Sequence, residues 1–269
     1  MSPPDARPFT AIILAAQRAG RVDLVAVEAG VANKSLAPIQ GAPLIRHVVD
    51  ALLATPGLTH LRIVVEPETA AAIEAILPRA RTAVVDFVPA ADNLADSVYA
   101  AAAGVDQPML ITTSDNVLLT PGAAQAVLEP LAAGADVALA LCTEASVMAA
   151  HPQGQRRFYR FSDDAYSNCN LYALGGQGAM RVAESFRSGG QFAKKPLRMI
   201  VALGPINVVL MLTKRLSMRG AIRRLARRFR LKVEPVVLAD GAHAIDVDNA
   251  RTYACAEFLL AKRRQAMAA

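Results

Sequence analysis

The chain has 269 residues, of which 54% are apolar and 19% are charged, and its net charge is +6. This length and composition predict an ordered globular protein with a full hydrophobic core and exclude a disordered chain. The longest apolar run, at residues 199–212, is interrupted by Gly204, Pro205 and Asn207. It is also shorter than the ~20 residues that are needed to cross a bilayer.

The first residues lack the cationic stretch followed by an apolar run that is typical of a signal peptide. The three cysteines, Cys142, Cys169 and Cys255, are far apart in the sequence and lack the spacing of metal ligands. We therefore expect a cytoplasmic protein whose cysteines pack in its core.

The first half of the chain alternates short apolar runs with helical patterns. The pattern predicts strands at residues 9–16, 61–66, 81–88, 109–114 and 135–142. Between them it predicts helices at residues 43–54, 67–77, 94–104 and 121–134. Apolar strands that alternate with helices indicate a parallel sheet covered on both faces. The loops after the strands then lie along one sheet edge, where folds of this kind bind ligands.

The pattern changes after residue 142. Residues 151–168 are polar and aromatic and are expected to form a loop, and a strand at 170–174 and a helix at 178–189 follow. A strand at 231–239 and a helix at 249–265 close the chain. We expect this part to return to the same sheet. Residues 1–269 would then form one domain with a basic helical insertion at about 190–232.

The positive charge is concentrated in that insertion. Residues 194–232 contain twelve Lys or Arg and no Asp or Glu, so the rest of the chain carries about −6. Apolar residues recur there at helical spacing, at Met218, Ile222, Leu225 and Phe229, which predicts an amphipathic cationic helix. Residues 196–230 can contact an anionic membrane surface, form a dimer contact, meet a polyanionic acceptor, or dock on the core with a solvated arginine face. No nucleic-acid-reading motif accompanies the arginines, so we expect no nucleic-acid partner.

Three stretches carry polar residues at positions that suit a binding site. The buried strand at 109–114 ends on the carboxylate of Asp115, and Lys34 precedes a Gly-x-Pro-Leu-Ile sequence that begins at Gly41. Near the end of the chain, Asp246 and Asp248 are two residues apart. On an extended segment such residues face the same side, so both carboxylates can point at one cation.

Together these stretches resemble the MobA-like nucleotidyltransferases. This GT-A-like class includes the molybdenum-cofactor guanylyl- and cytidylyltransferases and the sugar-phosphate pyrophosphorylases. The resemblance spans about residues 11–260. It implies a three-layer α/β/α fold with a mainly parallel, mixed central sheet of the nucleotide-diphospho-sugar transferase (GT-A-like) type. It also implies an Mg²⁺-dependent enzyme that moves an NMP from an NTP to a phosphorylated small-molecule acceptor and releases pyrophosphate.

The resemblance assigns the first stretch to the nucleotide. In the family, a strand runs into a loop that wraps the triphosphate, which implies nucleotide binding by Leu14, Ala15, Ala16, Gln17 and Gly20. Lys34 and Arg21 receive catalytic roles, since a lysine at that place is a point charge that stabilises the phosphates during transfer. Gln17 stands where the family carries its first glycine. A side chain there restricts positive φ and crowds the approach of phosphate to the backbone. Either this loop binds its nucleotide differently, or this member is weakened.

The other two stretches are assigned to the metal and the acceptor. Asp115 and Asp248, with Asp246, are the implied Mg²⁺ ligands, and Mg²⁺ takes one or two carboxylates plus phosphate oxygens. The alternatives are a turn residue at Asp115 and an Asx turn that caps a helix at Asp246 or Asp248. By the same resemblance, Asn93 and Ser97 lie beneath the base and ribose, and Asn168 and Asn170 meet the acceptor.

Three other functions stay open at this point. One is a degenerate nucleotide-binding or regulatory protein on the same fold, which Gln17 motivates. The second is a glycosyltransferase that uses a nucleotide-sugar, although the sequence around Lys34 favours a nucleotidyltransferase. The third is a peripheral membrane protein whose basic helix is its main functional part.

Overall fold

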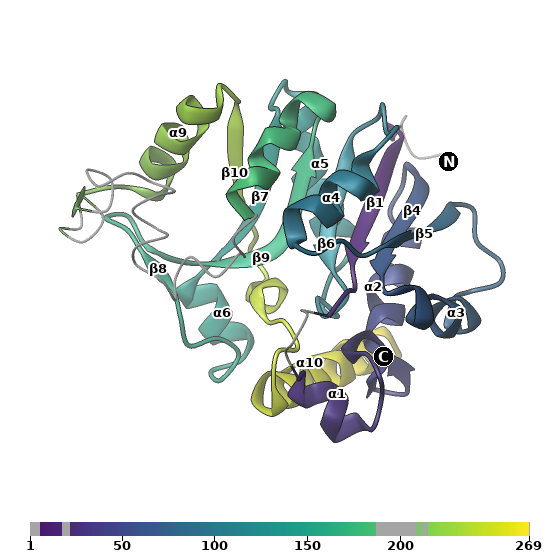
Figure 1. Cartoon of the computed structure of the whole chain (residues 1–269). Coiled ribbons are helices and arrows are strands. Elements are labelled where there is room, and N and C mark those ends of the chain that lie inside the picture. Colours follow the sequence, from purple (N-terminus) through teal and green to yellow (C-terminus); the bar gives the residue numbers. More distant parts are fainter. Residues whose placement is uncertain (1–5, 18–21, 187–208, 211–212, 214, 269) are drawn as a thin grey trace.

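The computed structural model describes residues 6–17, 22–186, 209–210, 213 and 215–268 (Figure 1). Within them, one sheet of eight strands runs through the molecule in the order β10-β7-β9-β6-β1-β4-β5, with β8 paired to β9. The strands are β1 (Phe9–Leu14), β4 (Leu58–Val65), β5 (Val84–Pro89), β6 (Met109–Thr113), β7 (Val137–Thr143), β8 (Tyr159–Arg160), β9 (Ala165–Leu174) and β10 (Val233–Val237). A separate two-stranded ribbon joins β2 (Pro38–Ile39) and β3 (Ala42–Pro43).

The sheet is mainly parallel, with one antiparallel strand inside it. β1 pairs parallel with both β4 and β6, and β10 pairs parallel with β7. β9 runs antiparallel between β6 and β7. The carboxyl ends of β1, β4 and β6 therefore lie side by side at one edge of the sheet, and the amino-terminal half of β9 reaches the same edge.

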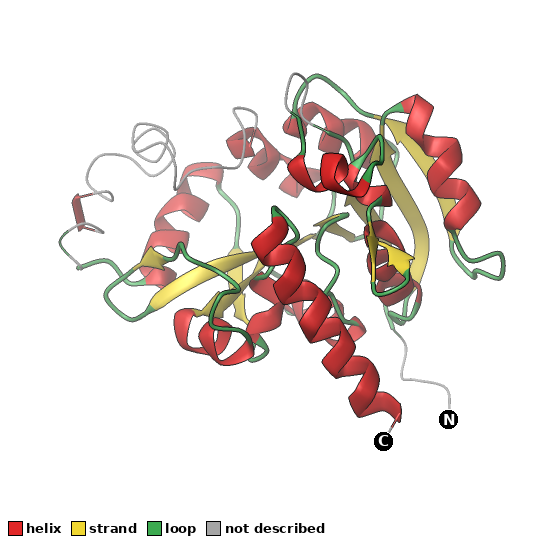
Figure 2. Cartoon of the chain, turned by 90° about the horizontal axis from the view of Figure 1, so that it is seen from below, coloured by secondary structure: helices red, strands yellow, loops and turns green. Residues whose placement is uncertain are grey.

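Helices cover both faces of the sheet, and the alternation along β1 shows why. Ala11 and Ile13 belong to the larger hydrophobic cluster, while Ile12 between them belongs to the second one. The larger cluster includes side chains from α2 (Leu44–Leu53), α3 (Pro67–Ile76), α5 (Pro121–Ala132) and α10 (Ala250–Ala268). The second includes side chains from α4 (Leu94–Ala102) and the 3₁₀ helix η2 (Gln177–Phe186). Figure 2 shows the long α10 ending at the C-terminus. The predicted three-layer, mainly parallel mixed fold is confirmed.

Two local predictions differ from the structure. Residues 165–168 were expected in a loop, but β9 begins at Ala165 because its first residues pair with Leu141, Cys142 and Thr143 of β7. The helix expected at 178–189 is a 3₁₀ helix at its described residues. Two short helices were not anticipated, α1 (Leu24–Ala29) and α6 (Glu144–Ala150). Each has an N-cap side chain, from Asp23 and Thr143 respectively.

The basic helix is confirmed as α9 (Met218–Phe229). Met218 and Ile222 pack against Leu141 and Tyr166, and Phe229 packs on the second cluster. The chain then returns to the sheet at β10. Most of the insertion expected at 190–232 that precedes α9 lies outside the described residues, so its extent stays a prediction.

All three cysteines are free and buried, as expected. None of the helices in the described part of the chain combines the length and the hydropathy that a membrane crossing needs.

Candidate functional site

Lys34 begins a short 3₁₀ helix, η1 (Lys34–Leu36), that is hydrogen-bonded to the residue after β6. The side chain of Asn33 caps this turn by accepting the N–H of Ser35 at 2.8 Å. The hydroxyls of Ser35 and Ser114 lie 2.8 Å apart within hydrogen-bonding distance, and both residues are buried. Since Ser114 directly precedes Asp115, this contact holds Lys34 beside the carboxylate that ends the strand.

The ammonium of Lys34 lies among three carboxylates. Its Nζ is 2.5 Å from Asp115 Oδ2, and it is 3.8 Å from both Asp248 Oδ1 and Asp23 Oδ2. The Lys34 side chain is only 16% exposed, so solvent screens the contact with Asp115 weakly, whereas Asp248 is 71% exposed and its ion pair is strongly screened. Burial lowers the pKa of Lys34, but the charge and hydrogen bond of Asp115, and then Asp248 and Asp23, raise it above its ordinary value overall. Lys34 is therefore a cation at any physiological pH.

The C-terminal segment reaches this place through a backbone contact. The N–H of Val247 donates to the carbonyl oxygen of Asp115 at 3.1 Å, which brings Asp246 and Asp248 to the end of β6. Asn249 caps the start of α10 by accepting the N–H of Thr252. The Thr252 hydroxyl in turn accepts the N–H of Asp248 at 2.9 Å. The helix-capping role, which was the alternative for Asp246 or Asp248, is thus filled by Asn249.

Asn170 sits at an irregularity in β9 that directs it to Asp246. The register between β7 and β9 shifts between Leu139 and Leu141, opposite this part of β9. Asn170 has a φ of +47°, in the left-handed region that asparagine tolerates better than most residues. Its Nδ2 donates to Asp246 Oδ2 at 2.6 Å, and Asn168 Nδ2 donates to Asn170 Oδ1 at 2.9 Å. Both predicted acceptor residues therefore lie in one hydrogen-bonded row with a predicted metal ligand.

The carboxylates at this edge have spare oxygen acceptors. Asp115 Oδ1 and Asp246 Oδ1 are buried and have no hydrogen-bond partner among the described residues. Burial, followed by the charges of Asp115 and Asp248, raises the pKa of Asp246 well above its ordinary value. Hard carboxylate oxygens without partners fit Mg²⁺. In the described ranges, however, no three His, Cys, Asp or Glu side chains form a group that could hold a metal ion by themselves.

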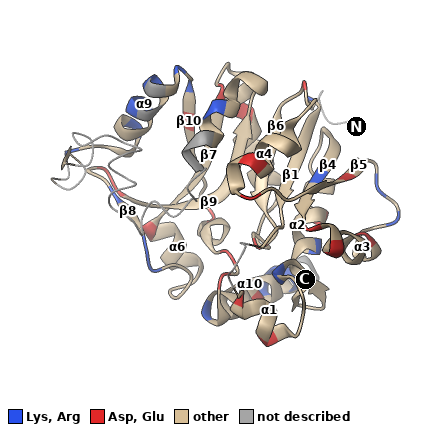
Figure 3. Cartoon of the chain, in the orientation of Figure 1, with Lys and Arg blue, Asp and Glu red and all other residues tan. Residues whose placement is uncertain are grey.

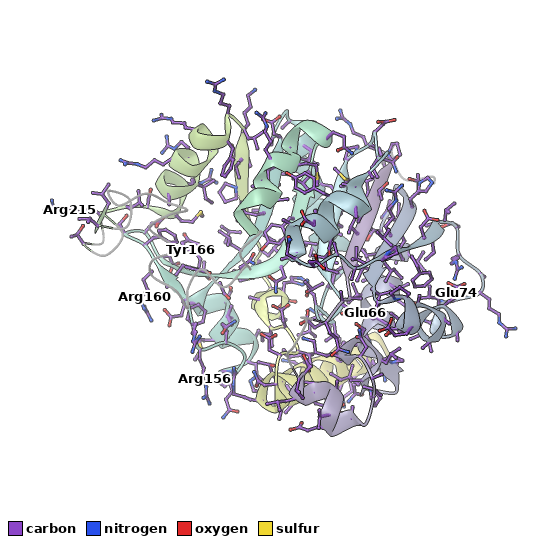
Figure 4. All side chains as sticks on the ribbon, in the orientation of Figure 1. Glu66, Glu74, Arg156, Arg160, Tyr166 and Arg215 are labelled. Atoms are coloured by element: carbon purple, nitrogen blue, oxygen red, sulfur yellow. The ribbon has the colours of Figure 1, made fainter. Side chains whose placement is uncertain are left out.

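The loop after β1 is held by a carboxylate. The backbone N–H of Gln17 donates to Glu66 Oε1 at 2.6 Å, and the Gln17 side chain donates to the carbonyl of Ala32. Asn33 Nδ2 donates to Glu66 Oε2 and to the carbonyl of Ala15, both at 3.1 Å. Gln17 is not among the residues with positive φ, so this loop does not adopt the conformation that a glycine would permit there. In Figure 4, Glu66 lies at the lower end of the central strands.

The other predicted nucleotide residues fall into two groups. Leu14 ends β1, Ala15 is buried and Ala16 is exposed, whereas Gly20 and Arg21 lie outside the described residues. Asn93 caps α4, and the buried Ser97 hydroxyl accepts the N–H of Ala91 at 3.0 Å. The observed contacts of Asn93 and Ser97 thus stabilise the start of a helix, and their roles toward a nucleotide stay predictions.

Two residues of the site were missed in the sequence. Glu66 directly follows the buried strand β4, which is the signal that identified Asp115 after β6. Asp23 precedes α1, where its Oδ1 accepts the N–H groups of Val25 and Ala26 while its Oδ2 faces Lys34. Asp23 belongs to none of the motifs in the sequence, and its place beside Lys34 depends on α1.

Comparison with known proteins decides the family. Residues 11–185, well over half of the chain, match the sequence model of the MobA-like NTP transferase domain. The chain belongs to this family. It is thus a nucleotidyltransferase, as the resemblance in its motifs implied. No curated protein matches the chain.

Solved structures share the fold of this MobA-like NTP transferase. A hypothetical transferase from Thermus thermophilus has a TM-score of 0.72 at 22% identity, over 92% of this chain and 100% of that one. A CMP:2-keto-3-deoxy-manno-octonic acid synthetase in complex with CTP has a TM-score of 0.61 at 13% identity, over 95% and 99%. A 4-diphosphocytidyl-2C-methyl-D-erythritol synthase from Anaerococcus prevotii has a TM-score of 0.59 at 11% identity, over 96% and 100%.

Proposed function

We propose that this protein moves an NMP from an NTP to a phosphorylated small-molecule acceptor and releases pyrophosphate, with Mg²⁺ as its cofactor. One observation carries the proposal: the ammonium of Lys34 lies 2.5 Å from Asp115 and 3.8 Å from Asp248. These residues come from the start, middle and end of a MobA-like chain. They meet at the sheet edge where parallel α/β folds bind their ligands.

Asp115 and Asp248 are the residues that would hold Mg²⁺, with Asp246 beside them. Their hard oxygens and the buried acceptor without a partner on Asp115 support this assignment. When bound, the cation supplies positive charge against the phosphate oxygens of the nucleotide.

The reaction needs no nucleophile from the protein. A phosphate oxygen of the acceptor attacks the α-phosphorus of the NTP in line and forms a new P–O bond. The bond from the α-phosphorus to the bridging oxygen breaks, and pyrophosphate leaves with the electron pair. Lys34 stabilises the charge on the phosphates, and the amides of Asn168 and Asn170 orient the acceptor. Gly20 and Arg21 are assigned to the phosphates by the family resemblance.

An assay of pyrophosphate release tests the proposal. Purified protein is incubated with Mg²⁺, each of the four NTPs and a panel of phosphorylated acceptors. CTP comes first, because two of the similar structures carry cytidine in their names. We expect turnover with at least one pair, and a loss of about a hundredfold or more in kcat for Asp115→Asn. The exposed Asp106 lies in the loop before β6, at the opposite end of that strand, so Asp106→Asn is the control. Absence of both turnover and NTP binding across the panel would contradict the proposal.

A nucleotide-binding protein without turnover is the second candidate. The N–H of Gln17, which follows the strand β1 where the family loop binds phosphate, already donates to Glu66. A loop engaged in this way favours altered or weakened phosphate binding. This candidate predicts that NTPs bind in the same experiment while no acceptor gives pyrophosphate.

We also retain, as inferences from the sequence, a cytoplasmic location and one domain over residues 1–269.

A further inference from the structure

The predicted metal position already contains a positive charge. Four carboxylates gather at this end of the sheet, those of Asp23, Asp115, Asp246 and Asp248, and the ammonium of Lys34 lies among them. Lys34 Nζ is 2.5 Å from Asp115 Oδ2 and 3.8 Å from Asp248 Oδ1, and these two carboxylates are the groups expected to hold Mg²⁺. The acidic residues of the described site thus surround a cation that belongs to the chain itself.

Asp23 contributes to this arrangement from a part of the chain outside the predicted motif. As the N-cap of α1, its carboxylate is fixed by the N–H groups of Val25 and Ala26, and its second oxygen is 3.8 Å from Lys34 Nζ. The lysine is therefore in contact with Asp23 as well as with Asp115 and Asp248. We regard Asp23 as a positioning residue for Lys34.

This arrangement penalises a divalent cation that enters alone. Its double charge would lie within a few ångströms of the Lys34 ammonium, and the repulsion between them is strong where solvent is partly excluded. A triphosphate removes that penalty, because it offers Lys34 anionic oxygens outside the carboxylate cluster. The lysine stem is long and flexible, so its ammonium can move from the carboxylates to the phosphates.

We propose that Lys34 is the resident cation of the ligand-free site, and that the site accepts a divalent cation and a triphosphate together instead of the free cation. This inference rests on the proposed function and adds the form in which its nucleotide substrate is bound. Lys34 neutralises the carboxylates before the substrate arrives and then follows the phosphates.

Binding of Mn²⁺ in the absence of nucleotide tests the inference. Free Mn²⁺ is followed by electron paramagnetic resonance during titration of the intact protein. We expect Lys34→Met to bind Mn²⁺ at least about tenfold more tightly than the wild type, because the competing charge is gone. Lys34→Arg keeps the charge and is expected to remain within about threefold of the wild type. The exposed Lys262 on α10 supplies the control Lys262→Met, which is expected to leave the affinity unchanged.

A Lys34→Met protein that binds Mn²⁺ no more tightly than the wild type would overturn the inference. Circular dichroism checks that each variant is folded. If Lys34→Met is not, Lys34→Gln removes the same charge while retaining a donor for Asp115, and the same criterion applies to it. The titration involves no nucleotide and no turnover, so its failure is distinguishable from failure of the proposed function. An active nucleotidyltransferase can fail this test, and a protein without transferase activity can pass it.

Discussion

At the scale of single residues, Glu66 links the two segments that are proposed to bind the phosphates, the loop after β1 and the turn that carries Lys34. One carboxylate oxygen accepts the N–H of Gln17 after β1, and the other accepts the side chain of Asn33, the residue before Lys34. Asn33 is fully buried, so its amide needs partners within the protein. Glu66 therefore fixes the positions of both the loop after β1 and the turn that carries Lys34.

Replacement of Glu66 by Ala is expected to lower the free energy of unfolding by about 1–3 kcal/mol. The change removes two hydrogen bonds to a charged acceptor and leaves Asn33 with fewer partners. Urea denaturation at pH 7 measures the loss. Glu68→Ala, an exposed position in the first turn of α3, is the matched control and should stay within about 0.5 kcal/mol of the wild type. Equal stability of the two variants would show that the Glu66 contacts contribute little.

How much of the site the sequence predicts depends on the kind of signal each residue carries. The resemblance to the MobA-like family placed Lys34 and Asp115 together, because a lysine before Gly-x-Pro-Leu-Ile and a carboxylate after a buried strand are local patterns that carry it. Asp248 was assigned by the same resemblance, with its spacing to Asp246 in support. The role of Asp23 depends on α1 and on a contact across the site, neither of which leaves a mark in the neighbouring residues. Ser97 was assigned to the nucleotide, yet its observed partner is the nearby backbone of Ala91.

At the scale of elements, Arg263 joins α10 to the segment that leads into the site. Arg263 donates to Asp240 Oδ2 at 2.9 Å and to the carbonyl of Leu118 at 2.7 Å. Asp240 caps the 3₁₀ helix η4 (Gly241–Ala244), which directly precedes the segment of Asp246. Burial raises the pKa of Asp240, but the N–H of Ala242 and then Arg263 lower it below its ordinary value overall.

Arg263→Met is expected to destabilise the protein by about 0.5–1 kcal/mol at pH 7, since Asp240 is half exposed and the pair is screened. A carboxylate whose pKa is lower in the folded state than in the unfolded state stabilises the fold at pH values above its unfolded-state pKa. This stabilisation is lost as the pH falls through the folded-state pKa. The effect should therefore shrink below about pH 4, without vanishing, because the bond to Leu118 does not titrate. Thermal unfolding at pH 7 and pH 3 measures both values. The exposed Arg264→Met is the control, and a difference between the variants that does not depend on pH would contradict the role of Asp240.

The elements themselves were predictable to different degrees. The parallel strands were found because they are short apolar runs between helices, as in residues 109–114. The start of β9 was missed because the polar Ser167 and Asn168 follow a polar and aromatic segment. β9 lies between β6 and β7 in the sheet. The hydrophobic pattern of one segment does not reveal which strands flank it.

At the scale of the whole molecule, basic residues are concentrated beside the edge strand β10, away from the candidate site. Figure 3 shows basic residues along α9, beside the edge strand β10. The apolar side chains of Met218 and Ile222 are packed against the protein, so they are not available for insertion into lipid. Of the alternatives for residues 196–230, the described part of α9 therefore supports a helix docked on the core, and any membrane contact through α9 would be electrostatic.

If α9 does adsorb to an anionic membrane, the double variant Arg223→Gln, Arg227→Gln should weaken binding about thirtyfold, at about 1 kcal/mol for each arginine. Both side chains are exposed. Co-sedimentation with phosphatidylserine-containing vesicles at low salt measures the change, and high salt should release the wild type. The double variant Arg156→Gln, Arg157→Gln is the control, because it removes the same two positive charges from the loop before β8. Arg156 is labelled in Figure 4. A wild-type protein that stays in the supernatant at low salt would leave α9 as an ordinary solvated face.

The position of Asp248 has a consequence for the synthesis of this protein. Lys34 and Asp115 leave the ribosome before Asp248, whose carboxylate belongs to the segment that directly precedes α10. If Asp248 holds the metal as proposed, a nascent chain can build most of its sheet and still be unable to hold a metal–nucleotide complex. The same holds for a gene fragment limited to residues 11–185, which carries the family signature but ends before either aspartate of the closing segment.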